Sequence, residues 1–314
     1  MPSNNWLRLP ASDDMTEASV ATISPDNRGL AYGDGFFTTM GVIDGRILWS
    51  DYHHQRLISH AKALQLKLDS HSLLTTLQGH AQQLAQGMLK LVVTRAVQDV
   101  QGYGYTPSTS GSACEAWLKT FAMTLNTGKQ LPLSDGRFIP VQPTSTAVCL
   151  SSKIACLPSS LAGLKSLNRL DNVLASGELQ RMQAEPLAAG IVTRLDEGLL
   201  RDMSGNWVEG TMSNVFYQLS EPTPSINIDI DAPNYLTTGQ WYTPSMAQSG
   251  VAGVMRQVII DALSDTERPV VIRSLQDEDL PRVTQFFFCN ALRGIMPMSS
   301  LRLLSGDIVD FAPI

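Results

Sequence analysis

The order of secondary-structure signals in the first hundred residues constrains the fold most strongly. Residues 30–49 predict a hairpin whose two strands are joined by Asp44-Gly45, a dipeptide typical of tight turns. Two segments with apolar residues at helical spacing follow, 53–66 and 72–85, and a Val/Thr-rich strand is predicted at 89–97. Strands that flank a helical pair favour packing of both helices on one sheet, so the pattern predicts an α+β fold.

The second half of the chain also mixes strands and helices. The stretch Pro140–Thr146 is expected to link two domains, 1–142 and 143–314, because prolines keep an extended course without backbone partners. Beyond it we expect strands at 146–154, 188–195, 213–219, 269–275 and 284–292, and helices at 163–175 and 253–263. A strand at 116–125 and loops at 101–114 and 221–234 complete the prediction. Two sheet-containing domains are therefore expected.

Composition excludes several classes of protein. The net charge is −6 and no Lys/Arg cluster is present, which argues against a nucleic-acid partner. No run of about 18 apolar residues spans a membrane, and the start MPSNNWLRLP lacks the pattern of a secretion signal, so we expect no membrane association and a cytoplasmic location. The four cysteines form no C-x-x-C pair, which favours free buried thiols over a metal site or disulfides.

Five short fragments carry side chains or backbone groups suited to chemistry, although each one alone fits an ordinary structural role equally well or better. They are Arg56 on the first predicted helix, Lys165 at or just before a helix start, Glu209 at a strand end, the helix that opens at Gly253, and Asn290 at another strand end. A lysine at a helix start meets the positive end of the helix dipole, which makes Lys165 unusual. The helix at Gly253 offers unpaired backbone N–H groups that attract anions.

Taken together, these groups match the needs of pyridoxal phosphate. A lysine amine bonds to the aldehyde of this cofactor, a carboxylate keeps its ring nitrogen protonated, and an arginine with helix-end amides holds its phosphate. Lys165, Glu209 and Arg56 supply the three side chains in this interpretation. The fragments therefore favour a cofactor-dependent enzyme that acts on a small molecule.

The sequence resembles the fold-type IV pyridoxal-phosphate enzymes, which include branched-chain aminotransferases, D-amino-acid aminotransferases and 4-amino-4-deoxychorismate lyase. The resemblance rests on RGLAYGDGFFTTMGVIDGRI, HHQRL, KSLNRLDNVLA, VEGTMSNVF and GVAGVMRQ, in this order along nearly the whole chain. It implies two α+β domains, each with a sheet or barrel-like sheet and packed helices, and the cofactor between them. It also implies roles for individual residues: Lys165 as the Schiff-base lysine, Arg56, Val254, Met255 and Asn290 at the phosphate, Glu209 at the ring nitrogen, and Thr38, or else Thr39, near the substrate, with Thr38 catalytic.

Within this family the lyase is favoured. Arg169 within KSLNRL, the run GVMRQ, and CNAL followed by Met296-Pro297 are similar to the lyase, so we expect conversion of 4-amino-4-deoxychorismate to 4-aminobenzoate and pyruvate for folate synthesis. The alternatives are a D-amino-acid or branched-chain aminotransferase and, from another class, a non-catalytic carrier of pyridoxal phosphate.

Two departures from the lyase pattern stand beside this expectation. Gln101 stands where the lyase often has an arginine for a substrate carboxylate, and insertions lie near 106–115 and 221–240. The resemblance further implies a homodimer in which Tyr103 or Tyr105 reaches a neighbouring subunit's site.

Overall fold

The computed structural model describes residues 6–9, 19–20, 22–106, 109–125, 128–184, 195–220, 236 and 239–312. The chain divides into two compact units. The first unit holds Met1–Leu125 and Leu164–Asn168, and the second unit holds Asn126–Gly163 and Arg169–Ile314. The division thus falls at residue 125 rather than at 142, because the stretch expected to link two domains contains the end of one strand and the start of another, both in the second unit's sheet.

The first unit is built on a six-stranded antiparallel sheet. Its elements are β1 (Leu7–Leu9), β2 (Ser19–Val20), α1 (Arg28–Tyr32), β3 (Gly35–Ile43), β4 (Arg46–Ile47), α2 (Ser50–Ala63), α3 (Ser70–Leu84), β5 (Gly87–Arg95), a 3-10 turn (Thr109–Ser112) and β6 (Cys114–Ala122). The strand order is β2-β1-β6-β5-β3-β4. The β3–β4 turn has positive φ at Asp44 and Gly45, as the sequence predicted, but the residues before Gly35 form α1 instead of extending the strand.

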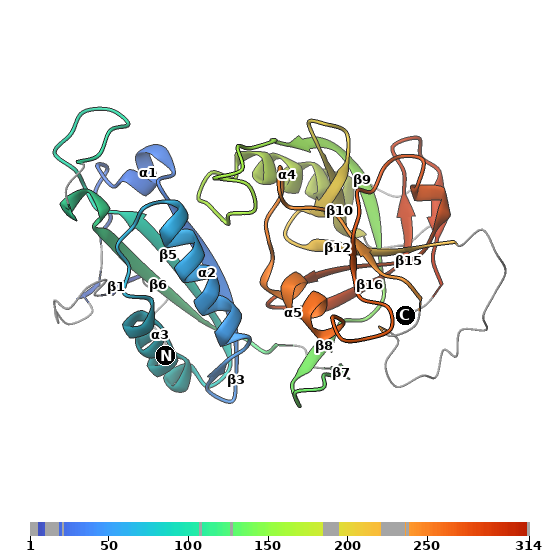
Figure 1. The fold of residues 1–314 in the computed structure, drawn as a ribbon, viewed down its shortest axis with the longest axis horizontal. Coiled ribbons are helices and arrows are strands. Elements are labelled where there is room, and N and C mark those ends of the chain that lie inside the picture. Colours follow the sequence, from blue (N-terminus) through green and yellow to red (C-terminus); the bar gives the residue numbers. More distant parts are fainter. Residues whose placement is uncertain are drawn as a thin grey trace. The chain divides into compact units, whose positions relative to one another are not determined.

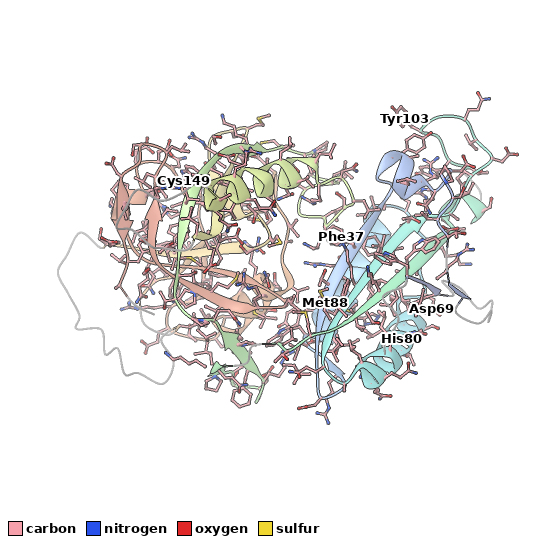
Figure 2. All side chains as sticks on the ribbon, turned by 180° about the vertical axis from the view of Figure 1, so that it is seen from behind. Phe37, Asp69, His80, Met88, Tyr103 and Cys149 are labelled. Atoms are coloured by element: carbon pink, nitrogen blue, oxygen red, sulfur yellow. The ribbon has the colours of Figure 1, made fainter. Side chains whose placement is uncertain are left out.

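Alternation along β3 separates the two faces of this sheet. Phe36, Thr38, Met40 and Val42 are fully buried against α2 and α3, together with Leu57 of α2. The two helices run along this face in Figure 1. Figure 2 shows Phe37 and Met88 on the other side of the sheet from Asp69, the N-cap of α3, and from His80, which lies within α3. We call the side that carries Phe37 the second face.

The second unit is dominated by one large mixed sheet. Its elements are β7 (Lys129–Pro132), β8 (Phe138–Val141), β9 (Ser145–Ile154), α4 (Leu170–Ala184), β10 (Leu195–Asp202), β11 (Trp207–Gly210), β12 (Asn214–Leu219), β13 (Tyr242–Thr243), α5 (Val254–Ala262), β14 (Val271–Ile272), a 3-10 turn (Leu280–Arg282), β15 (Val283–Asn290), β16 (Gly294–Arg302) and β17 (Ile308–Asp310). Strands β9, β10, β11, β12, β15 and β16 pair in a closed ring, which makes this part of the sheet a barrel.

Two hydrophobic clusters hold the barrel together. One takes side chains from all six strands of the ring, including Val215, Phe286 and Phe288. The other packs Ala175 and Leu179 of α4 against β9 and β10. Figure 1 shows α4 lying beside these strands. Parallel pairing of β9 with β10 requires a crossover, and α4 provides it.

The helix predicted at 163–175 begins later than expected. It starts at Leu170, so Lys165 lies in an extended segment and the argument from the helix dipole does not apply. Leu170, Val173 and Leu174 are exposed, although their spacing suggested a core-facing stripe. The packed face of α4 is made by Ala175 and Leu179 instead. The periodicity was real, but it marked the wrong face of the helix.

Most other predicted elements are present. The predictions at 53–66, 72–85, 89–97, 116–125 and 253–263 match α2, α3, β5, β6 and α5 within a few residues at each end. The loop at 221–234 and most of the strand at 188–195 lie outside the described residues. All four cysteines are free; Cys149 and Cys289 are buried as predicted, whereas Cys114 is partly buried and Cys156 is exposed. In the described parts of the chain, no helix is long and apolar enough to cross a membrane.

Packing of α2 on the sheet gives a direct test of the first unit. Leu57 is fully buried, so Leu57→Ala is expected to lower the free energy of unfolding by about 2–5 kcal/mol through lost contacts and an unfilled cavity. Ile58, the next residue, is 42% exposed, and Ile58→Ala should cost far less. Denaturant unfolding followed by tryptophan fluorescence measures both values. Equal losses in the two variants would contradict this assignment of the helix face.

Candidate functional site

Lys165 is held by its backbone at the free edge of β3. The Phe37 N–H donates to the Lys165 carbonyl at 3.0 Å, and the Leu167 N–H donates to the Gly35 carbonyl at 3.0 Å. Phe36 and Ser166 form an antiparallel bridge. Since Phe37 and Lys165 are opposite one another, their side chains share the second face, and the Lys165 Nζ lies 4.8 Å from the centre of the Phe37 ring.

His60 fixes the same segment from α2. The Lys165 N–H donates to His60 Nε2 at 2.9 Å, so this nitrogen carries no proton and the ring proton is on Nδ1. Nδ1 lies 3.2 Å from Ser59 Oγ, which accepts it. The His60 ring also packs edge-on against Phe36. One neutral histidine therefore positions the backbone of Lys165 relative to α2 and β3.

Arg56 and Thr38 meet on the helix-covered face. The Arg56 Nη1 donates to Thr38 Oγ1 at 3.4 Å, and His53 Nδ1 lies 2.8 Å from the same oxygen. His53 is fully buried, and its Nε2 has no hydrogen-bond partner among the described residues. Burial, with smaller effects from the charges of Arg56 and Lys165, holds the pKa of His53 well below 6.5. The ring is therefore neutral near pH 7.

The two threonines predicted near the substrate lie on opposite faces of β3. Thr38 belongs to the buried set beneath α2, whereas Thr39 shares the second face with Phe37. Only Thr39 is thus on the face that carries the Lys165 amine. The catalytic role of Thr38 stays a prediction.

Glu209 and Asn214 hold the loop that leads into α5. They are direct partners across β11 and β12. The Glu209 Oε2 accepts the Val251 N–H at 2.8 Å, and the Asn214 Nδ2 donates to the Val251 carbonyl at 2.8 Å. Both side chains are buried. Two polar groups on neighbouring strands thereby bind both backbone groups of a single loop residue and fix its position.

The N-terminus of α5 has the form of an anion site. Gly253 is its N-cap and makes no side-chain hydrogen bond to the first turn, which leaves helix-end N–H groups at Val254 and Met255 without a side-chain cap. A β-carbon at Gly253 would overlap with Asn214 Oδ1. Close approach of Asn214 therefore requires glycine here, although the φ angle of −70° would suit any residue.

Asn290 and the two tyrosines have clear local surroundings. The Asn290 Oδ1 accepts the N–H groups of Leu292 and Arg293 at 3.1 and 2.8 Å, so this side chain caps the β15–β16 turn. Its predicted role at a phosphate stays a prediction. Tyr103 is 84% exposed on the loop after β5 (Figure 2), whereas the Tyr105 hydroxyl donates to Gln65 Oε1 at 2.7 Å.

Comparison with known proteins places the chain. The amino-transferase class IV family model matches residues 35–301. The chain belongs to the class IV amino-transferase family. It is 23% identical over 282 residues to an aminodeoxychorismate lyase of Vibrio harveyi, which covers 88% of this chain and 86% of the relative. It is 28% identical over 301 residues to a putative branched-chain-amino-acid aminotransferase of Methanocaldococcus jannaschii, with 93% and 87% covered.

A solved structure agrees with this placement. The 4-amino-4-deoxychorismate lyase of Pseudomonas aeruginosa has a TM-score of 0.67 and 28% identity to the chain, with 90% of this chain and 88% of that chain covered. The predicted fold-type IV architecture is thereby confirmed. Class IV membership also indicates pyridoxal phosphate as the cofactor. The matches include both a lyase and an aminotransferase, so they support the family and leave the choice of reaction to direct assay.

The residues present fit this cofactor. In the second unit, the α5 N-terminus offers backbone donors suited to a phosphate, and the buried Glu209 carboxylate suits a protonated ring nitrogen. In the first unit, His53 Nε2 is a buried polar atom without a partner among the described residues, next to the Arg56 guanidinium. An orphaned buried nitrogen is costly unless a ligand satisfies it, which accords with an anion held beside Arg56.

Sequence reasoning missed three residues of this arrangement. His53 and His60 flank Arg56 on α2, one turn to either side, and Asn214 faces Glu209 across two strands. The helical spacing of the two histidines to Arg56 places all three near one face, which is a usable signal in the sequence. Nothing local marks Asn214, since its role depends on the register of β11 with β12.

Steric crowding at Gly253 predicts a sensitive position. Gly253→Ala is expected to weaken binding of pyridoxal phosphate by roughly tenfold or more, because the new methyl group displaces Asn214 or the first turn of α5. Gly79→Ala is the matched control, since a β-carbon on this residue of α3 meets nothing within 4 Å. Titration of each protein with the cofactor, followed by visible absorbance, gives the two affinities. Equal affinities in the two variants would contradict the crowding argument.

Burial of neutral His53 predicts a pH-dependent stability. The unfolded chain binds a proton at this residue below about pH 6.5, whereas the folded chain does not, so the free energy of unfolding falls as the pH drops below that value. The contribution is at most about 1.4 kcal/mol per pH unit. Denaturant unfolding at about pH 7.5 and about pH 5.5 should show a smaller acid loss in His53→Gln than in the parent. The exposed His71→Gln serves as control, and an unchanged acid loss in His53→Gln would refute the assignment.

Proposed function

We propose that the chain is a pyridoxal-phosphate-dependent lyase that converts 4-amino-4-deoxychorismate to 4-aminobenzoate and pyruvate, a reaction of folate synthesis. The observation that carries the proposal is the 28% identity to the Pseudomonas aeruginosa lyase over 90% of the chain, joined to the lysine, glutamate and helix N-terminus described above. Oligomerisation as a homodimer belongs to the same proposal.

Each unit supplies part of the cofactor's ligands in this proposal. Arg56 and the N–H groups of Val254 and Met255 bind the phosphate, with Asn290 as a further ligand, and Glu209 keeps the ring nitrogen protonated. Within the second unit, the Gly163 carbonyl accepts the Ala252 N–H just before α5. When bound, pyridoxal phosphate bonds to an amine and withdraws electrons from the bonds beside it.

Lys165 acts as the general base in this proposal. Its amine takes the proton from the ring carbon that bears the substrate amine, and the C–O bond that joins the adjacent ring carbon to the enolpyruvyl group then breaks as the ring becomes aromatic. A proton returned to the departing three-carbon unit completes pyruvate, so atoms balance without an oxidant or reductant. The hydrogen bonds of the Lys165 backbone to Phe37 and His60 keep the amine on the second face through these steps.

The amine of Lys165 provides the direct test. Lys165→Ala is expected to lower formation of 4-aminobenzoate by roughly 10²–10⁴-fold or more, since one residue acts as both covalent anchor and base. The assay incubates the cofactor-loaded protein with chorismate, glutamine and the synthase that makes the substrate, and follows 4-aminobenzoate fluorescence. Lys67→Ala, at an exposed position, is the control. Full turnover by Lys165→Ala would end the proposal.

An aminotransferase is the second candidate. The 28% identity to the Methanocaldococcus jannaschii relative over 93% of the chain favours it. An amino donor alone would then change the visible absorption of the cofactor, and a 2-oxo acid would restore it. The same protein would form no 4-aminobenzoate, so the two assays separate the candidates.

A further inference from the structure

A row of polar residues crosses the second face of the first unit's sheet. Thr39 of β3 pairs directly with Lys90 of β5, and Lys90 pairs directly with Lys119 of β6. The neighbours of these residues along each strand, such as Thr38, Leu91 and Leu118, are buried beneath α2 and α3. Alternation therefore places all three members of the row on the face that also carries Phe37 and the Lys165 amine.

Two like charges thus face each other across adjacent strands. Directly opposed lysines destabilise a sheet unless an anion lies near them. Among the described residues, neither Lys90 nor Lys119 forms an ion pair. Glu115, an acid on the same face, is bonded to Arg8 at 2.7 Å and to Asn27 at 2.9 Å. The described chain therefore leaves this pair without a counter-charge.

Aromatic rings confine both ammonium groups. The Lys90 Nζ lies 5.6 Å from the centre of the Phe37 ring, and the Lys119 Nζ lies 4.8 Å from the Phe121 ring and 5.9 Å from the Trp6 ring. Such contacts hold a cation in place without neutralising it. Phe37 is also the ring beneath the Lys165 Nζ. Lys90 and Lys165 therefore place their amines against one and the same side chain.

We propose that Lys90 and Lys119 bind a carboxylate of the substrate, with the Thr39 hydroxyl as a neighbouring donor. The inference deepens the function proposed above and rests on it. The substrate amine must reach Lys165, and in 4-amino-4-deoxychorismate a ring carboxylate lies directly across the ring from that amine. Gln101 replaces the arginine expected for a substrate carboxylate, and the lysine pair supplies the missing positive charge from another strand.

The site also selects among amines by the position of their acid group. A simple amino acid carries its carboxylate on the carbon that bears the amine. When that amine is held at Lys165, the carboxylate does not reach Lys90 and Lys119. An aminobenzoate with its two groups at opposite ends of a ring satisfies both. The pair therefore favours substrates that carry a carboxylate remote from the reacting amine.

Binding of 4-aminobenzoate and of aniline tests the inference without turnover. The two compounds differ only in the carboxylate. Equilibrium dialysis against the cofactor-loaded parent should show tighter binding of 4-aminobenzoate than of aniline, and this preference should fall roughly tenfold in Lys90→Gln and in Lys119→Gln. Lys62→Gln, at an exposed position of α2 on the opposite side of the sheet, makes the same charge change and should keep the preference.

Kinetics and conservative variants complete the experiment. In the lyase assay the two Gln variants should raise KM roughly tenfold with little change in kcat, and Lys90→Arg and Lys119→Arg should restore most of the loss. An unchanged preference for 4-aminobenzoate in both Gln variants would overturn the inference even if the protein is a lyase. If the parent has no lyase activity but prefers 4-aminobenzoate, and the Gln variants lose that preference, the carboxylate site is retained and the proposed function is refuted. Normal cofactor absorbance in each variant shows that it has folded.

Discussion

Backbone pairing between residues 165–167 and the start of β3 is the interaction on which the functional arrangement depends. It carries a short piece of chain out of the second unit and makes it part of the first unit's sheet. Because the pairing is antiparallel and in fixed register, it decides that Lys165 stands opposite Phe37 and that its amine emerges on the second face. A slip of one residue would send the amine toward α2 instead. The bond from the Lys165 N–H to His60 opposes that slip.

In the second unit, side chains of the barrel fix a loop that itself forms no helix or strand. Closure of the six-stranded ring sets Glu209 beside Asn214, and this pair binds both backbone groups of Val251. The loop then reaches Gly253 in a defined position, so the first turn of α5 points its N–H groups in a fixed direction. The barrel strands therefore position both the Glu209 carboxylate and the N-terminus of α5. The close approach of Asn214 to Gly253 shows how tightly this region is packed.

The sequence was sufficient to locate most helices and strands, but it was insufficient to predict which of their faces pack together. Strong periodicity and the Asp44-Gly45 turn located α2, α3, β3 and β5 closely, since local preferences and packing agree there. The prediction for the segment around Lys165 failed because the unpaired edge of β3 binds this segment as extended backbone, through the Phe37 N–H and the Gly35 carbonyl. Family resemblance pointed to Lys165, Arg56 and Glu209, and helical spacing to Arg56 could have pointed to His60, but Asn214 becomes visible only through strand register. Pro140 was placed in a linker because the place of β8 in the large sheet depends on β16, which lies far along the chain.

Side chains alternate between the two faces of a strand, so Thr38 and Thr39 have different chemical surroundings although they are adjacent in sequence. Adjacent residues of a strand face opposite sides, so one threonine joins the neutral His53 and Arg56 under α2, and the other joins Lys90 and Lys119 in the open row. The first threonine therefore belongs with groups suited to an anionic cofactor, and the second with groups suited to an anionic substrate. Arranging both sets on one strand lets a single backbone element set the position of each relative to the Lys165 amine. Strand geometry decides which residue lies on which face, and the surroundings of the two faces differ because one is buried beneath helices and the other is not.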